Sequence, residues 1–189
     1  MVEPDDPKRG RVLVAAVGVF GRYGFQKTSM EAVAKAAGIS RPGLYLLFQN
    51  KERLYRATMQ GVMEGGQQAM EACLADDTLG FEDRIVAALD ALLGQYIETQ
   101  VSRDLGELLE NSEQLGSMFD DYQQKAKATI SAQVDSLAPP GVFTVELGAH
   151  DFTDVLFSAA VTWKLTVATR AEFRDRVRRA VRLIWRATS

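Results

Sequence analysis

Basic side chains are concentrated near the N-terminus, where they could neutralise the phosphates of a nucleic acid. Residues 1–55 contain nine Lys or Arg and five Asp or Glu, which gives this segment a net charge of +4. The whole chain has a formal net charge of −3, so the other 134 residues sum to −7. A basic end on an acidic body predicts that one end of the molecule meets DNA and that the rest does not.

Few other side chains could do chemistry. Cys73 is the one cysteine and His150 the one histidine, so neither an intramolecular disulfide nor a His/Cys zinc cluster can form. Cys73 has no second cysteine to resolve it as a redox sensor. Acidic pairs such as Glu107 and Glu110 belong to an ordinary polar helix face, and no phosphate loop or nucleophile elbow accompanies them. The sequence therefore predicts no cofactor, no metal and no enzyme, with a helical enzyme as the weaker alternative.

The apolar stretches of the chain are too short to cross a membrane. The uncharged segments, among them residues 12–21 and 155–163, do not exceed ten residues, whereas a bilayer span needs roughly 20 apolar residues. Acids at positions 3, 5 and 6 precede the first of these segments, which argues against a secretion signal. We expect a cytoplasmic protein in a reducing compartment.

The elements that position the basic residues are all expected to be helices. Apolar residues recur at helical spacing, and no stretch shows the sustained alternation of a strand. Pro139-Pro140-Gly141 is the strongest helix breaker. The predicted fold is all-α with about nine helices, expected at residues 7–23, 28–37, 41–48, 51–72, 81–98, 103–110, 112–137, 151–167 and 171–187.

Local signals set the helix boundaries near the basic end. Thr28-Ser29-Met30-Glu31 matches a capping box in which the threonine caps a helix. Gly38 can adopt the left-handed conformation that ends this helix, and Ser40 can cap the next one. Gln49-Asn50-Lys51-Glu52 looks like a further turn and cap, and Thr169-Arg170-Ala171-Glu172 is a second capping box at the start of the last helix. Two short helices around a glycine-containing turn form a helix-turn-helix at about residues 29–48. Its second helix can enter the major groove of DNA.

The residue types in this region narrow the class further. The pattern consists of Phe20, Gly24-Phe25, Thr28-Ser29-Met30, Val33-Ala34, Ala37-Gly38-Ile39-Ser40, Leu44-Tyr45, Phe48, Lys51-Glu52 and Leu54. It closely resembles the signature of the TetR (tetracycline repressor) family of transcriptional regulators. The resemblance implies a DNA-binding domain at residues 1–55, followed at 56–189 by a helical domain that dimerises and senses a ligand.

The resemblance also implies which residues face DNA. Thr28, at the start of the second helix, would hold a phosphate with its hydroxyl and the free amides, and Lys51 would supply a second phosphate contact. Leu47 stands where the family often has a histidine, so that contact is absent. Singly, each residue could be an ordinary packed or solvated side chain. The expected DNA-binding set is Thr28, Ser40, Arg41, Pro42, Gly43, Tyr45 and Lys51.

A dimer interface is expected because a single helix-turn-helix reads too few base pairs, and two half-sites require two subunits. The last two helices carry apolar stripes that could form a four-helix interface, as the resemblance implies. The alternative is that these stripes face the subunit's own core. The candidate interface residues are Phe152, Leu156, Ala159, Phe173, Val177, Val181 and Ile184.

A pocket for an apolar or aromatic effector would need apolar walls with a few polar groups. Aromatic and flexible side chains in the middle helices are candidates, with ordinary core packing as the alternative. These candidates are Tyr96, Met118, Phe119, Tyr122, Phe157 and Trp163.

Seven arginines lie between residues 170 and 186 of the last helix. They could form a second surface for nucleic acid or acidic lipid. We favour a solvated flank of the dimer seam, because acids such as Glu172 and Asp175 are interleaved with them. The sequence thus predicts a homodimeric repressor that binds a palindromic operator and is released by a small molecule. A ligand-independent regulator or an activator with the same DNA-binding domain is the alternative.

Overall fold

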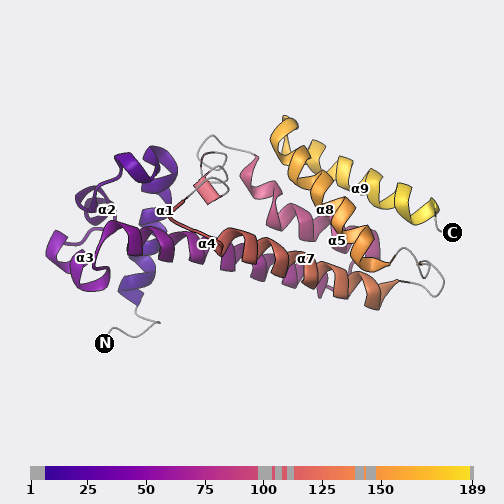
Figure 1. Ribbon diagram of the computed structural model, residues 1–189, viewed down its shortest axis with the longest axis horizontal. Coiled ribbons are helices and arrows are strands. Elements are labelled where there is room, and N and C mark those ends of the chain that lie inside the picture. The colour runs from indigo at the N-terminus through magenta and orange to yellow at the C-terminus, as the bar shows by residue number, and fades with distance from the viewer. Residues whose placement is uncertain are drawn as a thin grey trace. The chain divides into compact units, whose positions relative to one another are not determined.

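The structure, a computed structural model, describes residues 7–97, 104, 108–109, 113–138, 143 and 148–187, and side chains up to residue 183. Throughout these residues the regular elements are helices, and none is a strand, which confirms the all-α prediction (Figure 1). Among the same residues, no helix is long and apolar enough to cross a membrane. The expected helix at 103–110, with Glu107 and Glu110, lies almost entirely outside the described residues.

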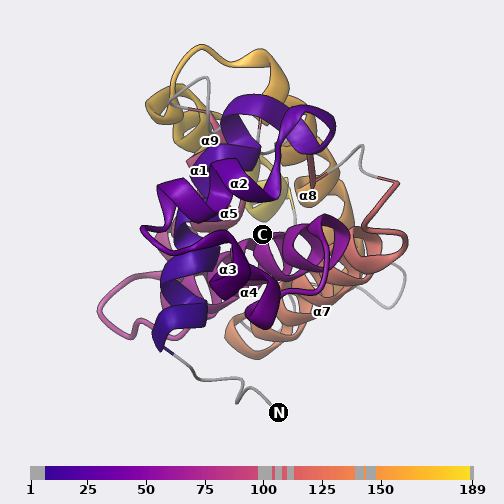
Figure 2. The same ribbon diagram turned by 90° about the vertical axis from the view of Figure 1, so that its left-hand side faces the viewer.

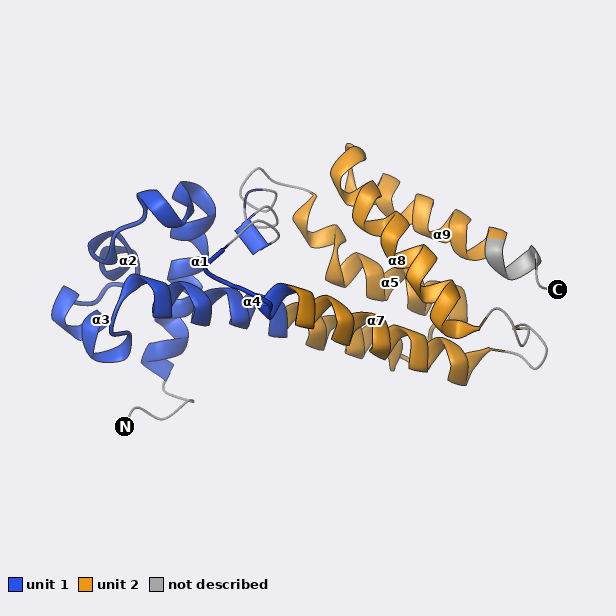
Figure 3. Ribbon diagram, viewed as in Figure 1, with its two compact units in different colours: residues 1–64, 99–119 blue, residues 65–98, 120–189 orange. Residues whose placement is uncertain are grey.

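The chain divides into two compact units (Figure 3). Unit 1 comprises residues 1–64 and 99–119, and unit 2 comprises residues 65–98 and 120–189. The division falls within helix α4 (Lys51–Leu74), which therefore contributes to both cores. The functional boundary after residue 55 was placed on the motif alone and stays a prediction.

Unit 1 is built on α1 (Pro7–Lys27), α2 (Met30–Ala36), α3 (Arg41–Leu47) and the first turns of α4. Figure 2 shows these helices from the side of α3. The α1 stripe of Val12, Ala16 and Phe20 is buried, and the Phe20 ring meets the ring of Tyr55 on α4 edge to face, with centroids 4.9 Å apart. Tyr55 is fully buried and donates a 3.3 Å hydrogen bond to the Leu108 carbonyl. Aromatic packing of this kind fixes α1 against α4.

Unit 2 contains the rest of α4, α5 (Phe81–Leu92), the short 3-10 helix η1 (Gly94–Tyr96), most of α7 (Met118–Leu137), α8 (Ala149–Thr166) and α9 (Arg170–Ala187). Two expected helices are shorter than predicted. The one expected through residue 98 ends at Leu92, where the chain tightens into η1, and the one expected from Ser112 begins at Met118 after a turn. At the start of α9, the Thr169 hydroxyl accepts from the Glu172 amide at 3.1 Å, as the capping box predicts.

The apolar stripes of α8 and α9 pack into the core of unit 2, which corrects their assignment to a dimer interface. Phe173, Val177 and Val181 are at most 1% exposed within a single chain, and Phe152 and Leu156 are also buried. The cause is helix α5, which covers this side of α9. A side chain already enclosed by its own subunit cannot meet a partner. Ala159 is half-buried, and the Ile184 side chain lies outside the description.

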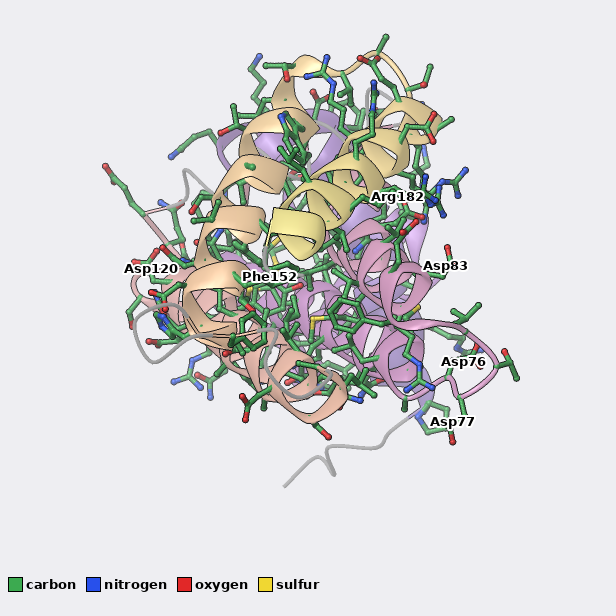
Figure 4. All side chains as sticks on the ribbon, turned by 90° about the vertical axis from the view of Figure 1, so that its right-hand side faces the viewer. Asp76, Asp77, Asp83, Asp120, Phe152 and Arg182 are labelled. Atoms are coloured by element: carbon green, nitrogen blue, oxygen red, sulfur yellow. The ribbon has the colours of Figure 1, made fainter. Side chains whose placement is uncertain are left out.

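The arginines of α9 are largely paired within unit 2. Arg178 forms salt bridges with Glu82 at 3.1 Å and Asp83 at 2.9 Å, and Arg182 contacts Glu82 at 2.8 Å. Figure 4 labels Arg182 and Asp83, and also Phe152 of the unit 2 core. Arg170 contacts the buried Asp90 at 2.8 Å. The arginine run is therefore the paired flank that the interleaved acids predicted, although its main partners come from α5.

Because the apolar stripe of α9 is buried, an acidic substitution in this stripe should affect the stability of the fold. Val177→Asp buries an unpaired carboxylate in the core of unit 2, and we expect it to destabilise the fold by roughly 3–5 kcal/mol. Val14→Asp is the matched control, because Val14 is also a valine within a helix and is 75% exposed. Circular dichroism should show loss of the cooperative thermal transition for the first variant and a folded protein for the second. Equal stability of both variants would contradict the burial of Val177.

Candidate nucleic-acid interface

The turn between α2 and α3 is fixed by backbone hydrogen bonds. Gly38 has φ 65°, a left-handed conformation that glycine adopts without a steric penalty. Its amide donates to the Lys35 carbonyl at 3.2 Å, and the Ile39 amide donates to the Ala34 carbonyl at 3.0 Å. This pair of bonds is a Schellman motif and satisfies two carbonyls at the end of α2. The sequence prediction for Gly38 is confirmed.

The start of α3 is capped by Ser40, also as predicted. The Ser40 hydroxyl accepts a 3.2 Å hydrogen bond from the Gly43 amide, and Pro42 occupies the first turn, where no amide donor is required. A Cβ on Gly43 would lie only 3.0 Å from the Ser40 oxygen. Glycine at this position therefore leaves room for the cap.

Burial divides α3 into an inner and an outer face. Leu44 is fully buried and Phe48, at the end of the helix, is nearly so. Pro42, Tyr45 and Leu46 are exposed and share the opposite face, at positions i, i+3 and i+4. Three predicted DNA-binding residues of α3, Arg41, Pro42 and Tyr45, are therefore exposed to solvent.

Arg41 and Tyr45 interact along this outer face. The guanidinium carbon of Arg41 lies 5.8 Å from the centre of the Tyr45 ring, one helical turn away. Tyr45 is 41% exposed, so its ring packs on one side and its hydroxyl remains accessible. A guanidinium held over an aromatic ring keeps its donors available.

Thr28 does not present its hydroxyl to solvent, which corrects the predicted phosphate contact. It is 3% exposed and its hydroxyl donates to the Gly24 carbonyl at 2.7 Å. Gly24 has φ 70° and kinks α1, which leaves that carbonyl without a helical partner. The cap of α2 is Ser29 instead, whose hydroxyl accepts from the Ala32 amide at 3.1 Å. The cap therefore lies one residue later than predicted, and the reciprocal bond of a capping box cannot form, because Ala32 stands where the box requires Glu or Gln.

Lys51 has an intramolecular role, and its phosphate contact stays a prediction. Its ammonium donates to the Gln26 carbonyl at 3.3 Å and lies 4.4 Å from the centre of the Phe25 ring. These contacts hold the start of α4 against the end of α1. Asn50 caps α4, because its side-chain oxygen accepts from the Arg53 amide at 2.8 Å. Lys51 is half-buried, so the ammonium keeps donors for an anion.

The structure adds residues from α1 that the sequence reasoning missed. The Lys8 ammonium lies 3.8 Å from where a Cβ would stand on Gly43, and the Arg9 guanidinium lies 5.2 Å from the centre of the Phe48 ring. The first turn of α1 therefore brings two cations to the two ends of α3. The sequence shows these two cations as the pair Lys8-Arg9. Their contact with α3 is tertiary, and no local pattern indicates it.

The electrostatics of this surface favour an anion. Arg9, Arg41, Lys51 and Arg53 form no salt bridge with any acid among the described residues. The N-terminus of α3, at Arg41, adds the positive end of a helix dipole. Together they can hold phosphate groups while the outer face of α3 meets base edges.

The candidate effector residues fall in both units. Met118 and Phe119 belong to unit 1. Tyr96 and Phe157 are buried in unit 2, where Tyr122 and Trp163 are partly buried against the same core. Phe157, Tyr122 and Trp163 therefore belong to one core, as ordinary packing would also require, whereas Tyr96 is buried outside that cluster.

Unit 2 also contains buried polar atoms that lack hydrogen bonds. The Tyr96 hydroxyl, the Gln67 side-chain oxygen and the Thr153 hydroxyl have no hydrogen-bond partner among the described residues. Burial raises the pKa of Tyr96 to about 12, so this phenol is neutral at ordinary pH. The Gln67 nitrogen donates to Glu71 at 2.7 Å and Thr129 at 3.3 Å, which orients its oxygen. Among the described residues, no cluster of His, Cys, Asp or Glu could hold a metal.

The fold and geometry of unit 1 define a helix-turn-helix whose exposed helix is flanked by cations. The family model for "Bacterial regulatory proteins, tetR family" matches residues 12–58, the region that contains this motif. The crystal structure of a TetR-family regulator from Mesorhizobium loti superposes with a TM-score of 0.79 at 17% identity and covers 98% of each chain. The fatty acid degradation regulator FadR from Bacillus halodurans superposes with a TM-score of 0.75 at 19% identity and covers 97% of each.

Two curated relatives are also regulators by name. The HTH-type transcriptional activator FasR of Mycolicibacterium smegmatis is 35% identical over 99 residues, which is 50% of this chain and 42% of FasR. The HTH-type regulator YhgD of Bacillus subtilis is 27% identical over 158 residues, which is 83% of this chain and 79% of YhgD. The match to FasR thus spans less than half of that protein. Through residues 12–58, the chain is therefore similar to the bacterial regulatory proteins of the tetR family.

Proposed function

We propose that this protein is a DNA-binding transcriptional repressor that acts as a homodimer on a palindromic operator and is released by a small molecule. The observation that carries the proposal is the outer face of α3, where Arg41 and Tyr45 are exposed among cations that have no acidic partner in the described residues. This is the arrangement that a recognition helix requires. A cytoplasmic location accords with that role.

Two alternatives differ in how the same DNA-binding unit is used. FasR is an activator by name, so DNA binding alone does not determine the sign of regulation. A ligand-independent regulator would bind DNA equally well. We favour ligand release because unit 2 encloses polar atoms that its own side chains leave without hydrogen bonds.

The first test concerns two cations with different roles on DNA. Arg41→Ala should cost roughly 1–3 kcal/mol per half-site and relax preference at one base position, because a guanidinium can pair with guanine. Lys51→Ala should weaken specific and non-specific binding alike and lower the salt slope by about one per subunit. Selection from random duplexes would give the operator. Mobility shifts on operator and scrambled DNA, across salt concentrations, would separate the two effects.

Lys51 also contacts Phe25 and Gln26, so a control must show that the variant remains folded. Lys51→Met keeps most of the packing of the alkyl chain on the ring and removes only the charge. A melting temperature near that of wild type, with the same loss of salt slope, would assign the effect to phosphate binding. If both cation variants bind DNA as wild type does, the recognition surface is misplaced.

Dimerisation is proposed through the outer faces of α8 and α9. The large apolar side chains that unit 2 exposes in the described residues all lie on these two helices: Val155 and Leu165 on α8, and Leu183 on α9. Apolar area that one chain leaves exposed is stabilised when a second copy covers it. This surface replaces the buried stripes that the sequence suggested.

Val155→Asp should therefore yield monomers, because a carboxylate at a closed apolar interface loses its hydration. Val14→Asp is the matched control, since Val14 is an exposed valine on α1 of unit 1. Light scattering coupled to size exclusion at micromolar concentration should show monomer for the first variant and dimer for wild type and control. A monomeric wild type, or a dimeric Val155→Asp protein, would contradict this interface.

Effector binding is proposed in unit 2 through the buried hydroxyl of Tyr96. Tyr96→Phe removes an unsatisfied buried group, so the free protein should be as stable as wild type or more stable, by up to roughly 1–3 kcal/mol. The same variant should lose part of the melting shift caused by an effector found in a metabolite screen. Tyr23→Phe on α1, where Tyr23 is 50% exposed, is the control and should change neither. An unchanged effector response in Tyr96→Phe would remove this residue from the site.

A further inference from the structure

A hollow of about 730 Å³ opens beside α3 in unit 1. Its apolar part includes Leu46 and Leu47 from α3, the Phe48 ring and Met118. Leu46 is 81% exposed, which is the highest value among the large apolar side chains in the described part of the chain. An apolar side chain that projects from a recognition helix can contact an apolar group of the DNA.

The rim of the hollow is cationic. Arg9 comes from α1, and Arg53 and Arg56 come from the first two turns of α4. None of the three forms a salt bridge with an acid among the described residues. Arg9 is held over the Phe48 ring, and Arg56 donates to the Gln114 carbonyl, so both are positioned without being neutralised.

The arginines of α9 differ from these rim arginines because they form salt bridges with acids. Arg178 and Arg182 of unit 2 meet the acids Glu82 and Asp83. The rim arginines of unit 1 meet no acid within the part of the chain that the structure describes. Uncompensated guanidinium groups around an apolar floor fit a partner that carries both anionic and apolar groups. A duplex has both, because each thymine projects a C5-methyl group into the major groove between two phosphate backbones.

We propose that this hollow extends the DNA interface: Leu46 reads a thymine methyl group, and the rim arginines, Arg53 foremost, bind the adjacent phosphates. The proposal rests on the proposed DNA-binding function and makes Leu46 a residue that determines specificity. It adds an apolar contact at the far end of α3 to the polar contact expected from Arg41 at its start. Each half-site of the operator should then contain one thymine that the protein recognises through its methyl group alone.

Replacement of thymine by deoxyuridine removes only the methyl group, so it tests Leu46 directly. Each thymine of the selected operator is replaced in turn, and the affinity of wild type is measured by mobility shift. One position per half-site should lose affinity roughly fourfold, the value expected for one buried methyl-sized group. Leu46→Ala should bind the thymine and deoxyuridine duplexes equally at that position. Val14→Ala, at an exposed apolar residue of α1 outside the hollow, is the control and should keep the wild-type difference.

Arg53→Gln tests the phosphate contacts independently. It should lower the slope of log affinity against log salt by about one per subunit and leave the deoxyuridine effect intact. Arg179→Gln, at an exposed arginine of α9, should change neither. If Leu46→Ala remains sensitive to deoxyuridine, or if no thymine position responds in wild type, the reading of Leu46 is overturned. If both variants bind as wild type, the hollow is not a DNA surface and the proposal is overturned. Failure to select any duplex would instead overturn the proposed function itself.

Discussion

Helix α3 has only seven residues, and the rest of unit 1 depends on how so short a helix is held. An isolated helix of this length is unstable in water, because nucleation is costly and few hydrogen bonds follow it. Its stability comes from the burial of Leu44 and Phe48 against unit 1, from the Ser40 cap and from the Schellman turn at Gly38. The same contacts determine its function. Once two positions are fixed inward, Pro42, Tyr45 and Leu46 must point outward, and the surface that could meet DNA is set before any DNA is present.

The distribution of ion pairs distinguishes structural from functional cations. On α9, arginines form salt bridges of 2.8–3.1 Å with Glu82 and Asp83, and these salt bridges link α9 to α5. Exposed pairs contribute little each, yet they remove free charge from that face. Around α3, cations are held by aromatic rings and carbonyls instead: Lys51 over Phe25, Arg9 over Phe48 and Arg41 over Tyr45. Such contacts orient a cation and leave its charge uncompensated, so the +4 charge of residues 1–55 is available to a polyanion.

The residues that the sequence placed correctly are those governed by local chemistry. Gly38, Ser40, Asn50 and Thr169 act as the turns and caps that their types predict, since a cap involves neighbours three or four residues away. Errors arose where a residue had two possible local partners or where tertiary packing decided. Thr28 and Ser29 can both cap a helix by type, and the hydrogen bond from Thr28 to the Gly24 carbonyl leaves the cap to Ser29. Val177 and its neighbours form a helical stripe that fits a dimer or a core equally well, and only the position of α5 assigns them to the core.

Buried polar atoms in unit 2 are the counterpart of the uncompensated cations in unit 1. Each unsatisfied group costs about 1–3 kcal/mol, a large fraction of a typical folding free energy of about 5–15 kcal/mol. Gln67, Tyr96 and Thr153 belong to α4, η1 and α8, so a ligand that bonds to them would restrain three elements at once. A ligand affects DNA binding only through a difference in its affinity for two conformations. Gln67 lies on α4, the helix that begins at Lys51, and a change in α4 would therefore act on an element that also belongs to the DNA-binding unit.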